Sequence, residues 1–171
     1  MAALLVLGGA RSGKSRYAQA RAEAVDGARI FIATAQAFDD EMTERIARHR
    51  ADRDQSWRTI EAPLDLAEAI ATASRAEAVI LVDCLTLWMS NVLLADRDTE
   101  AESLRLAAAV AASPAMLILV SNEVGFGIVP DNALARRFRD AAGTLNQSIA
   151  RIADEVILVA AGLPLKLKPS S

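Results

Sequence analysis

The sequence predicts an α/β fold with a mainly parallel central sheet and helices on both faces. Short, continuously apolar segments recur along the chain, and such segments are typical of strands that are covered on both faces. Longer segments of helical length separate them, as crossovers between parallel strands require. Several apolar segments end in small polar or acidic residues, so we expect candidate functional groups at the carboxyl edge of the sheet.

Strands are expected at a series of short segments. Most are runs of Val, Ile, Leu and Ala, and runs of this length and composition favour a strand over a helix. The last segment contains two lysines, which an edge strand tolerates. In chain order the expected strands are Ala3–Leu7, Arg29–Ala33, Trp57–Glu61, Ala78–Asp83, Met116–Val120, Glu155–Val159 and Leu165–Lys168.

The segments between these strands predict helices. Pro63 suits the start of a helix, and Asp131 suits a helix cap. The segment Asp39–Asp54 is dominated by charged residues, so its helix either projects from the body or faces a charged ligand. In chain order the expected helices are Lys14–Ala24, Asp39–Asp54, Leu64–Ala73, Leu85–Leu94, Thr99–Ala112 and Asp131–Ala153, and a flexible loop is expected at Val124–Pro130.

The turn from Gly8 to Ser15 fits the phosphate-binding pattern G-x-x-x-x-G-K-[ST] at every fixed position. Its glycines let the backbone close around an anion, and the N–H groups and dipole of the following helix favour negative charge. Lys14 supplies a cation for the outer phosphates, and Ser15 can hold Mg²⁺. The alternative is a chance glycine turn, and the flanking strand and helix argue against it. The loop therefore predicts a nucleoside triphosphate as ligand.

Asp83 ends an apolar run, as the acid of a Walker B strand does. In that role it emerges at the carboxyl end of a buried strand, near the Mg²⁺ of the phosphate loop. The alternative is an aspartate that caps the next helix. The phosphate loop in the same chain favours the metal-side role.

Length, charge and cysteine content set further limits. The 171 residues predict one domain, 1–171, and the net charge of −3 does not favour a nucleic acid as partner. Cys84 is the only cysteine, so no internal disulfide is expected and a reducing cytoplasm is the default location. The first apolar run ends at Gly8, too short for a signal peptide, and no run is long enough for a membrane span.

His49, the only histidine, has arginines on both sides. On a helix, Arg45 and Arg53 share its face, and nearby positive charge keeps an imidazole neutral and therefore nucleophilic. The arginines could hold a polyphosphate against it. The alternative is a solvated surface helix with an incidental histidine, and spacing alone favours that alternative.

A series of motifs in this order resembles the bifunctional adenosylcobinamide kinase / adenosylcobinamide-phosphate guanylyltransferase family. The resemblance extends from the first strand to Leu167. The HR pair on the polar helix, the following WRT-x-E and the NEVG-x-GIVP segment are its most specific parts. The matching segments are GGARSGKS, IATAQAFDDEM, RIARHRADR with WRTIE, VDCLTLWMSN, and VSNEVGFGIVP followed by ARRFRDAAGTLNQ.

The resemblance implies a RecA-like P-loop NTPase fold, a homotrimer and a role late in adenosylcobalamin synthesis. Adenosylcobinamide is phosphorylated with ATP or GTP, and GMP then passes from GTP to adenosylcobinamide phosphate, giving adenosylcobinamide-GDP and pyrophosphate. The GMP is carried as a covalent guanylyl-histidine, which matches His49. The residues that match the family's nucleotide contacts are Gly8, Gly9, Ala10, Arg11, Ser12, Gly13, Lys14, Ser15, Thr34, Ala35, Gln36, Arg50, Ala51, Asp52, Arg53, Glu61 and Asp83.

The chemistry assigns roles to some of these positions. His49 attacks the α-phosphorus of GTP, and Lys14 together with Mg²⁺ on Ser15 and Asp83 stabilises the leaving pyrophosphate. Glu123 is a candidate base or positioning group for the hydroxyl in the kinase step, with a cap or turn role as the alternative. How far the polar helix must swing to bring His49 to the loop is left open by the sequence.

Two other functions remain as alternatives. A simple small-molecule kinase would use the same loop, with the arginines at 136, 137 and 139 as a phosphoryl clamp and His49 incidental. A regulatory GTPase would need an N-K-x-D segment to read guanine, and the sequence has none. Its D-x-x-G pattern at Asp140–Gly143 falls inside an expected helix, which argues against the switch.

Overall fold

The computed structural model describes residues 2–36, 40–51 and 54–169; within 40–51 it gives the backbone throughout, but not the side chains of 41, 42, 45 and 48–50. In this part of the chain seven strands form one sheet in the order β3-β2-β4-β5-β1-β6-β7. All neighbours are parallel except β6 and β7. The strands are β1 (Ala2–Gly8), β2 (Ala28–Ala33), β3 (Trp57–Glu61), β4 (Ala78–Asp83), β5 (Met116–Asn122), β6 (Glu155–Ala160) and β7 (Leu163–Lys168).

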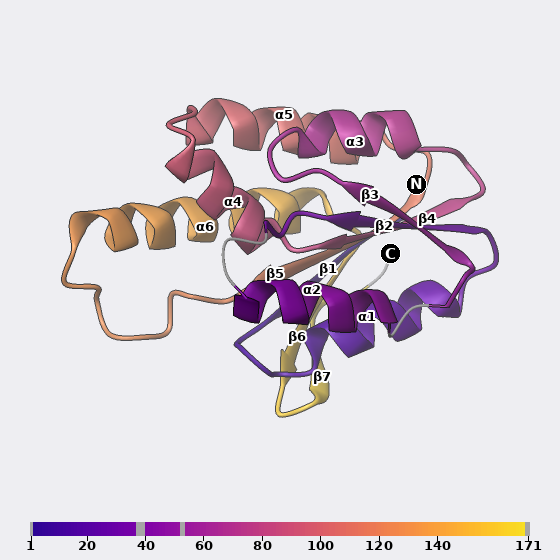
Figure 1. Ribbon diagram of the computed structural model, residues 1–171, viewed down its shortest axis with the longest axis horizontal. Coiled ribbons are helices and arrows are strands. Elements are labelled where there is room, and N and C mark those ends of the chain that lie inside the picture. The colour runs from indigo at the N-terminus through magenta and orange to yellow at the C-terminus, as the bar shows by residue number, and fades with distance from the viewer. Residues whose placement is uncertain (1, 37–39, 52–53, 170–171) are drawn as a thin grey trace.

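Helices cover both faces of the sheet, as the sequence predicted. Figure 1 shows α3, α4, α5 and α6 on one side, and α1 and α2 on the other. The side chains of β1 divide accordingly: Leu5 and Leu7 pack in the larger apolar cluster, whereas Leu4 and Val6 pack with α1. The helices are α1 (Lys14–Glu23), α2 (Asp40–Ala51), α3 (Leu66–Ala73), α4 (Leu85–Leu94), α5 (Thr99–Ala112) and α6 (Ala133–Ile152).

Several element boundaries differ from the sequence predictions by one or a few residues, and the differences at α2, α3 and α6 have identifiable causes or consequences. The polar helix α2 ends at Ala51, and the chain at 54 is no longer helical. Helix α3 begins at Leu66 rather than at Leu64, so Pro63 precedes it by a short turn. Helix α6 is capped by Asn132, whose side chain accepts from the N–H of Ala135, and not by Asp131.

The register places the carboxyl ends of the parallel strands in one row. Ala33 of β2 pairs with Glu61 on one side and with Asp83 on the other. Gly8, the last residue of β1, pairs with Asn122 of β5. The strand order puts β5 between β4 and β1, so the end of β5 separates Asp83 from the phosphate loop along this edge. Parallel strands with this arrangement bind ligands beyond their carboxyl ends.

Candidate active site

The phosphate loop connects the end of β1 to the start of α1. Gly8 admits no side chain, because a Cβ there would lie 2.4 Å from Ser12 Oγ and 2.7 Å from the carbonyl oxygen of Val159. Gly13 is the N-cap of α1 and has a φ of 95°, a conformation that favours glycine. The two fixed glycines therefore let the chain turn tightly enough to bring the helix N-terminus over the sheet edge.

The loop contains a buried cation, Lys14, and a buried hydroxyl, Ser12. Lys14 is only 7% exposed, and its Nζ donates to the carbonyl of Gly9 at 3.1 Å, so the ammonium group turns back across the loop. Ser12 Oγ is buried and has no hydrogen-bond partner among the described residues. A buried hydroxyl in this state normally has a ligand or water as partner. Both features suit a loop that closes around an anion.

The segment after β2 fixes the neighbouring strand end. The Thr34 hydroxyl accepts from the N–H of Cys84 at 2.9 Å and donates to the carbonyl of Cys84 at 2.7 Å. Asn91 of α4 donates to the carbonyl of Thr34 at 2.8 Å. Thr34 is fully buried, so its hydroxyl holds β2 to the β4–α4 junction. Ala35 and Gln36 follow it at the edge and are half-buried.

Asp83 does not cap the helix that follows it. The cap of α4 is Cys84, whose Sγ accepts from the N–H of Leu87 at 3.4 Å. Burial, and after it the charge of Asp83, raises the pKa of the Cys84 thiol to about 11, while Lys14 acts in the opposite direction. Cys84 is therefore a neutral thiol at physiological pH. The helix-cap alternative for Asp83 is therefore excluded. Its half-buried side chain lies at the carboxyl end of β4.

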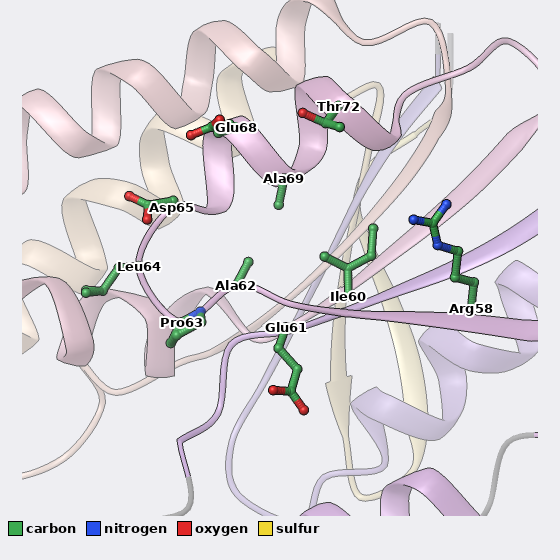
Figure 2. Close-up of a pocket in the computed structure, with 10 residues that line it drawn as sticks. All are labelled: Arg58, Ile60, Glu61, Ala62, Pro63, Leu64, Asp65, Glu68, Ala69 and Thr72. Carbon is green, nitrogen blue, oxygen red and sulfur yellow. The ribbon is translucent and has the colours of Figure 1, made fainter.

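Glu61 lies at the end of β3, beside a cavity of about 420 Å³ between β3 and α3. Figure 2 shows its carboxylate pointing away from Ala69, Glu68 and Thr72, which line the opposite wall. The side chain thus lies on the other side of the strand from α3. The cavity itself is on the face of α3 and not on the face of α1, so it is separate from the phosphate loop.

The helix with the predicted nucleophile is described in part. The backbones of His49 and Arg50 belong to α2, and Ala51 is its exposed last residue. The predicted contacts at Asp52 and Arg53 lie outside the described residues. Of the predicted site residues, those of the phosphate loop and those at the ends of β2, β3 and β4 lie along the same edge of the sheet, and Ala33 at the end of β2 pairs with both Glu61 and Asp83.

Two side chains offer oxygen ligands for the expected metal. Ser15 is in the first turn of α1, and Asp83 ends β4. The described residues contain no group of three or more His, Cys, Asp or Glu that could hold a metal ion. Mg²⁺ commonly takes one or two protein oxygens and completes its shell with phosphate and water, so the donors at 15 and 83 fit Mg²⁺.

Two of the three arginines proposed as a clamp for a simple kinase contact groups close to them in the sequence. Arg136 donates to the carbonyl of Pro130 at 2.8 Å and holds the end of the preceding loop. Arg139 pairs with Asp140 at 2.9 Å. The D-x-x-G pattern at Asp140–Gly143 lies within α6, as expected. Neither alternative function gains support from these contacts.

Sequence reasoning missed a buried polar network behind the sheet edge. Ser121 of β5 donates to Oδ1 of Asn146 at 2.6 Å, and the N–H of Asn122 donates to Oγ1 of Thr86 at 2.6 Å. Asn91 bridges the carbonyls of Thr34 and Pro63. The sequence did contain a signal for this network, because polar residues stand at positions where the helical spacing predicts apolar ones. A buried amide needs hydrogen-bond partners, so such residues indicate a polar network.

Together the fold and this edge define a P-loop nucleotide-binding protein of the α/β class. The chain belongs to the family described as cobinamide kinase / cobinamide phosphate guanyltransferase, whose model matches residues 4–167. The resemblance inferred from the motifs is therefore confirmed.

Curated relatives match over nearly their whole length. The chain is 49% identical to the bifunctional adenosylcobalamin biosynthesis protein CobP of Pseudomonas aeruginosa, over 96% of each chain. It is 43% identical to the bifunctional adenosylcobalamin biosynthesis protein CobU of Escherichia coli K12, over 96% of this chain and 99% of that one. The alignments therefore cover nearly all of both relatives.

Solved structures of low identity share the fold. A Pyrococcus horikoshii OT3 protein has a TM-score of 0.55 at 10% identity, over 99% of this chain and 87% of that one. An ATPase from the type III secretion system of pathogenic bacteria has a TM-score of 0.57 at 13% identity, over 96% of this chain and 56% of that one. The likeness to an ATPase agrees with the predicted P-loop fold class. Among the described helices, none combines the length and apolar character needed to cross a bilayer.

Proposed function

We propose that this protein phosphorylates the aminopropanol hydroxyl of adenosylcobinamide and then transfers GMP from GTP to the resulting phosphate. The observation that carries the proposal is the family match over residues 4–167, which includes both the phosphate loop and the helix with His49. Both steps use a nucleoside triphosphate, and the chain has one phosphate loop for it. ATP or GTP serves as phosphoryl donor in the first step, and GTP is the guanylyl donor in the second.

The first step needs positioning more than covalent chemistry. The hydroxyl oxygen attacks the γ-phosphorus, and the bond from that phosphorus to the β,γ-bridging oxygen breaks. Lys14 and the N–H groups at the start of α1 hold the phosphates. The buried hydroxyl of Ser12 gains a phosphate oxygen as its partner. Ser15 and Asp83 would hold Mg²⁺, which would supply positive charge beside the phosphate oxygens.

The second step uses His49 as a temporary carrier. The lone pair of its neutral imidazole attacks the α-phosphorus of GTP, an N–P bond forms, and pyrophosphate leaves with the bridging oxygen. An oxygen of adenosylcobinamide phosphate then attacks the same phosphorus, and the N–P bond breaks to return the free imidazole. Arg50, Ala51, Asp52 and Arg53, next to this histidine in the sequence, and Glu61 at the end of β3 are proposed to contact GTP.

The guanylylation step requires His49 of α2 to reach a nucleotide bound at the phosphate loop, and the direction of α2 bears on this. The helix follows the carboxyl end of β2, and the next strand, β3, begins at the opposite edge of the sheet. His49 lies about 13 Å along the helix axis from its first residue, at about 1.5 Å per residue. We therefore propose that α2 moves toward the phosphate loop before the attack. The assembly is proposed to be a homotrimer in the cytoplasm, with a subunit interface as one place to hold the large corrinoid.

Labelling with GTP tests the proposal directly. The protein is incubated with GTP labelled at the α-phosphate, denatured and examined for bound label. We expect label that is acid-labile and alkali-stable, and none in His49→Ala, because the chain has no other histidine. In parallel, GTP labelled at the γ-phosphate should label adenosylcobinamide. Label retained by His49→Ala would contradict the histidine carrier, whereas absence of any label in the wild type would leave only the kinase.

A further inference from the structure

Glu123 lies beside the first residue of the phosphate loop. It directly follows β5, and β5 lies between β1 and β4 in the sheet. The backbone N–H of Glu123 donates to the carbonyl of Gly8 at 3.0 Å. The residue therefore occupies the sheet edge between the phosphate loop and Asp83.

The peptide before Glu123 is held from both sides by buried side chains. The N–H of Asn122 donates to Thr86 Oγ1 at 2.6 Å, and Nδ2 of Asn146 donates to the carbonyl of Asn122 at 3.3 Å. Ser121 fixes the orientation of that amide through its bond to Asn146 Oδ1. Thr86, Ser121 and Asn146 are all buried. Contacts from α4, β5 and α6 thus fix the backbone from which the Glu123 side chain projects.

One oxygen of the Glu123 carboxylate is held by the turn that follows. Oε1 accepts from the N–H of Gly125 at 2.6 Å. A Cβ on residue 125 would lie 2.9 Å from the same oxygen, so the glycine is what lets the carboxylate fold against the turn. This contact stabilises the turn and leaves Oε2 for a further partner. The connection after it, up to α6, reaches outward from the carboxyl edge (Figure 1).

The other acids at this edge are less suited to meet an incoming hydroxyl. Asp83 is proposed to hold Mg²⁺ with Ser15. Glu61 ends β3, which is separated from β1 by β2, β4 and β5. Glu123 follows the strand next to β1, and its backbone N–H is bonded to Gly8, the first residue of the loop. Proton acceptance from an attacking hydroxyl is the role that kinases give to a carboxylate at this point.

We infer that Glu123 is the catalytic carboxylate of the kinase step. It accepts the proton of the aminopropanol hydroxyl as the oxygen attacks the γ-phosphorus and the bond to the β,γ-bridging oxygen breaks. Guanylyl transfer does not use this carboxylate, because an imidazole lone pair and an ionised phosphate oxygen attack without losing a proton. The inference rests on the proposed function, and it assigns the two reactions of this one site to different residues.

Glu123→Gln separates the two reactions. We expect the kcat for phosphorylation of adenosylcobinamide to fall by about 10²- to 10³-fold, the range for loss of a general base. Labelling of His49 by GTP labelled at the α-phosphate should stay within about twofold of wild type, which also shows that the variant folds and binds GTP. Gly125→Ala, which displaces the carboxylate without removing it, should give a smaller loss in the kinase step. Glu77→Gln is the control, because Glu77 is an exposed acid before β4 at the opposite edge.

The outcomes are distinguishable from failure of the proposed function. Wild-type kinase activity in Glu123→Gln would overturn the inference and leave the proposed function intact. An equal loss of phosphorylation and of His49 labelling would also overturn it, since the residue would then act on the fold or on GTP binding. A wild-type protein that neither phosphorylates adenosylcobinamide nor becomes labelled would overturn the proposed function itself.

Discussion

The backbone N–H of Gly162 donates a 2.8 Å hydrogen bond to the carbonyl of Ser12. The turn between β6 and β7 therefore supports the phosphate loop from a position 150 residues away in the chain. Gly162 has a φ of 78°, and its Cα lies 3.3 Å from the position that a Cβ on Gly13 would take. The geometry of the loop thus depends on glycines at both sides of this contact.

Gly162→Ala should lower both the stability of the protein and the binding of GTP. A side chain at this positive φ costs about 1 kcal/mol, although no atom lies within 4 Å of the added Cβ. We expect the free energy of unfolding to fall by about 1 kcal/mol, and the KM for GTP to rise, as measured by denaturant unfolding and by kinetics. Gly143→Ala is the matched control, because it lies within α6 with equally open space and should stabilise the helix. Equal effects of the two changes would contradict this explanation.

Lys14→Ala should reduce both reactions together. The Lys14 ammonium is buried in the loop beside the carbonyl of Gly9, and both steps place phosphate charge there. We expect about a 10²- to 10³-fold lower kcat in phosphorylation and in guanylylation. Lys14→Arg should not restore activity, because a planar guanidinium does not fit where a compact ammonium turns back across the loop. Restoration by arginine, or loss of one reaction alone, would show that the lysine acts differently.

Most of the strands and helices could be predicted from the sequence, because continuous apolar runs and helical spacing are local signals. The phosphate loop could also be predicted from a short stretch of sequence, since its glycines, lysine and serine all belong to one turn. The order of the strands was not, because nothing in the run at 116–122 says that it lies between β1 and β4. The place of Glu123 beside Gly8 follows from that order and so needed the structure. The same holds for Asn146, whose partners come from β5 and lie 24 and 25 residues away.

Thr34→Val should destabilise the protein without changing the shape of the side chain. The substitution removes a buried hydroxyl that serves both the N–H and the carbonyl of Cys84. A buried polar group left without a partner costs about 1–3 kcal/mol, and we expect a loss of that size in the free energy of unfolding. Because these bonds hold β2 to the end of β4, guanylylation by GTP should slow as well. Thr34→Ser, which keeps the hydroxyl, should recover most of the stability; if valine and serine destabilise equally, the hydrogen bonds are not responsible.

The Glu155–Arg21 ion pair should give the protein part of its stability at neutral pH. Its atoms are 2.7 Å apart, and the hydrogen bond from Arg21 lowers the pKa of the largely buried Glu155 carboxyl. A lowered pKa means that the contribution is present above the pKa of the unfolded chain and is lost as the pH falls through the folded value. We expect Glu155→Gln to lose about 1–2 kcal/mol at pH 7 and to show a flatter decline in unfolding free energy on the acid side. Glu77→Gln, at an exposed position, is the control; an acid profile unchanged from wild type in Glu155→Gln would contradict this role.

The central claim is that His49 carries GMP between the two substrates. Enzyme labelled from GTP at the α-phosphate is freed of nucleotide and mixed with adenosylcobinamide phosphate in the absence of GTP. We expect the label to leave the protein and to appear in adenosylcobinamide-GDP in one turnover, at a rate no slower than steady-state transfer. Label that stays on the protein, or that is released only as free GMP, would contradict the claim.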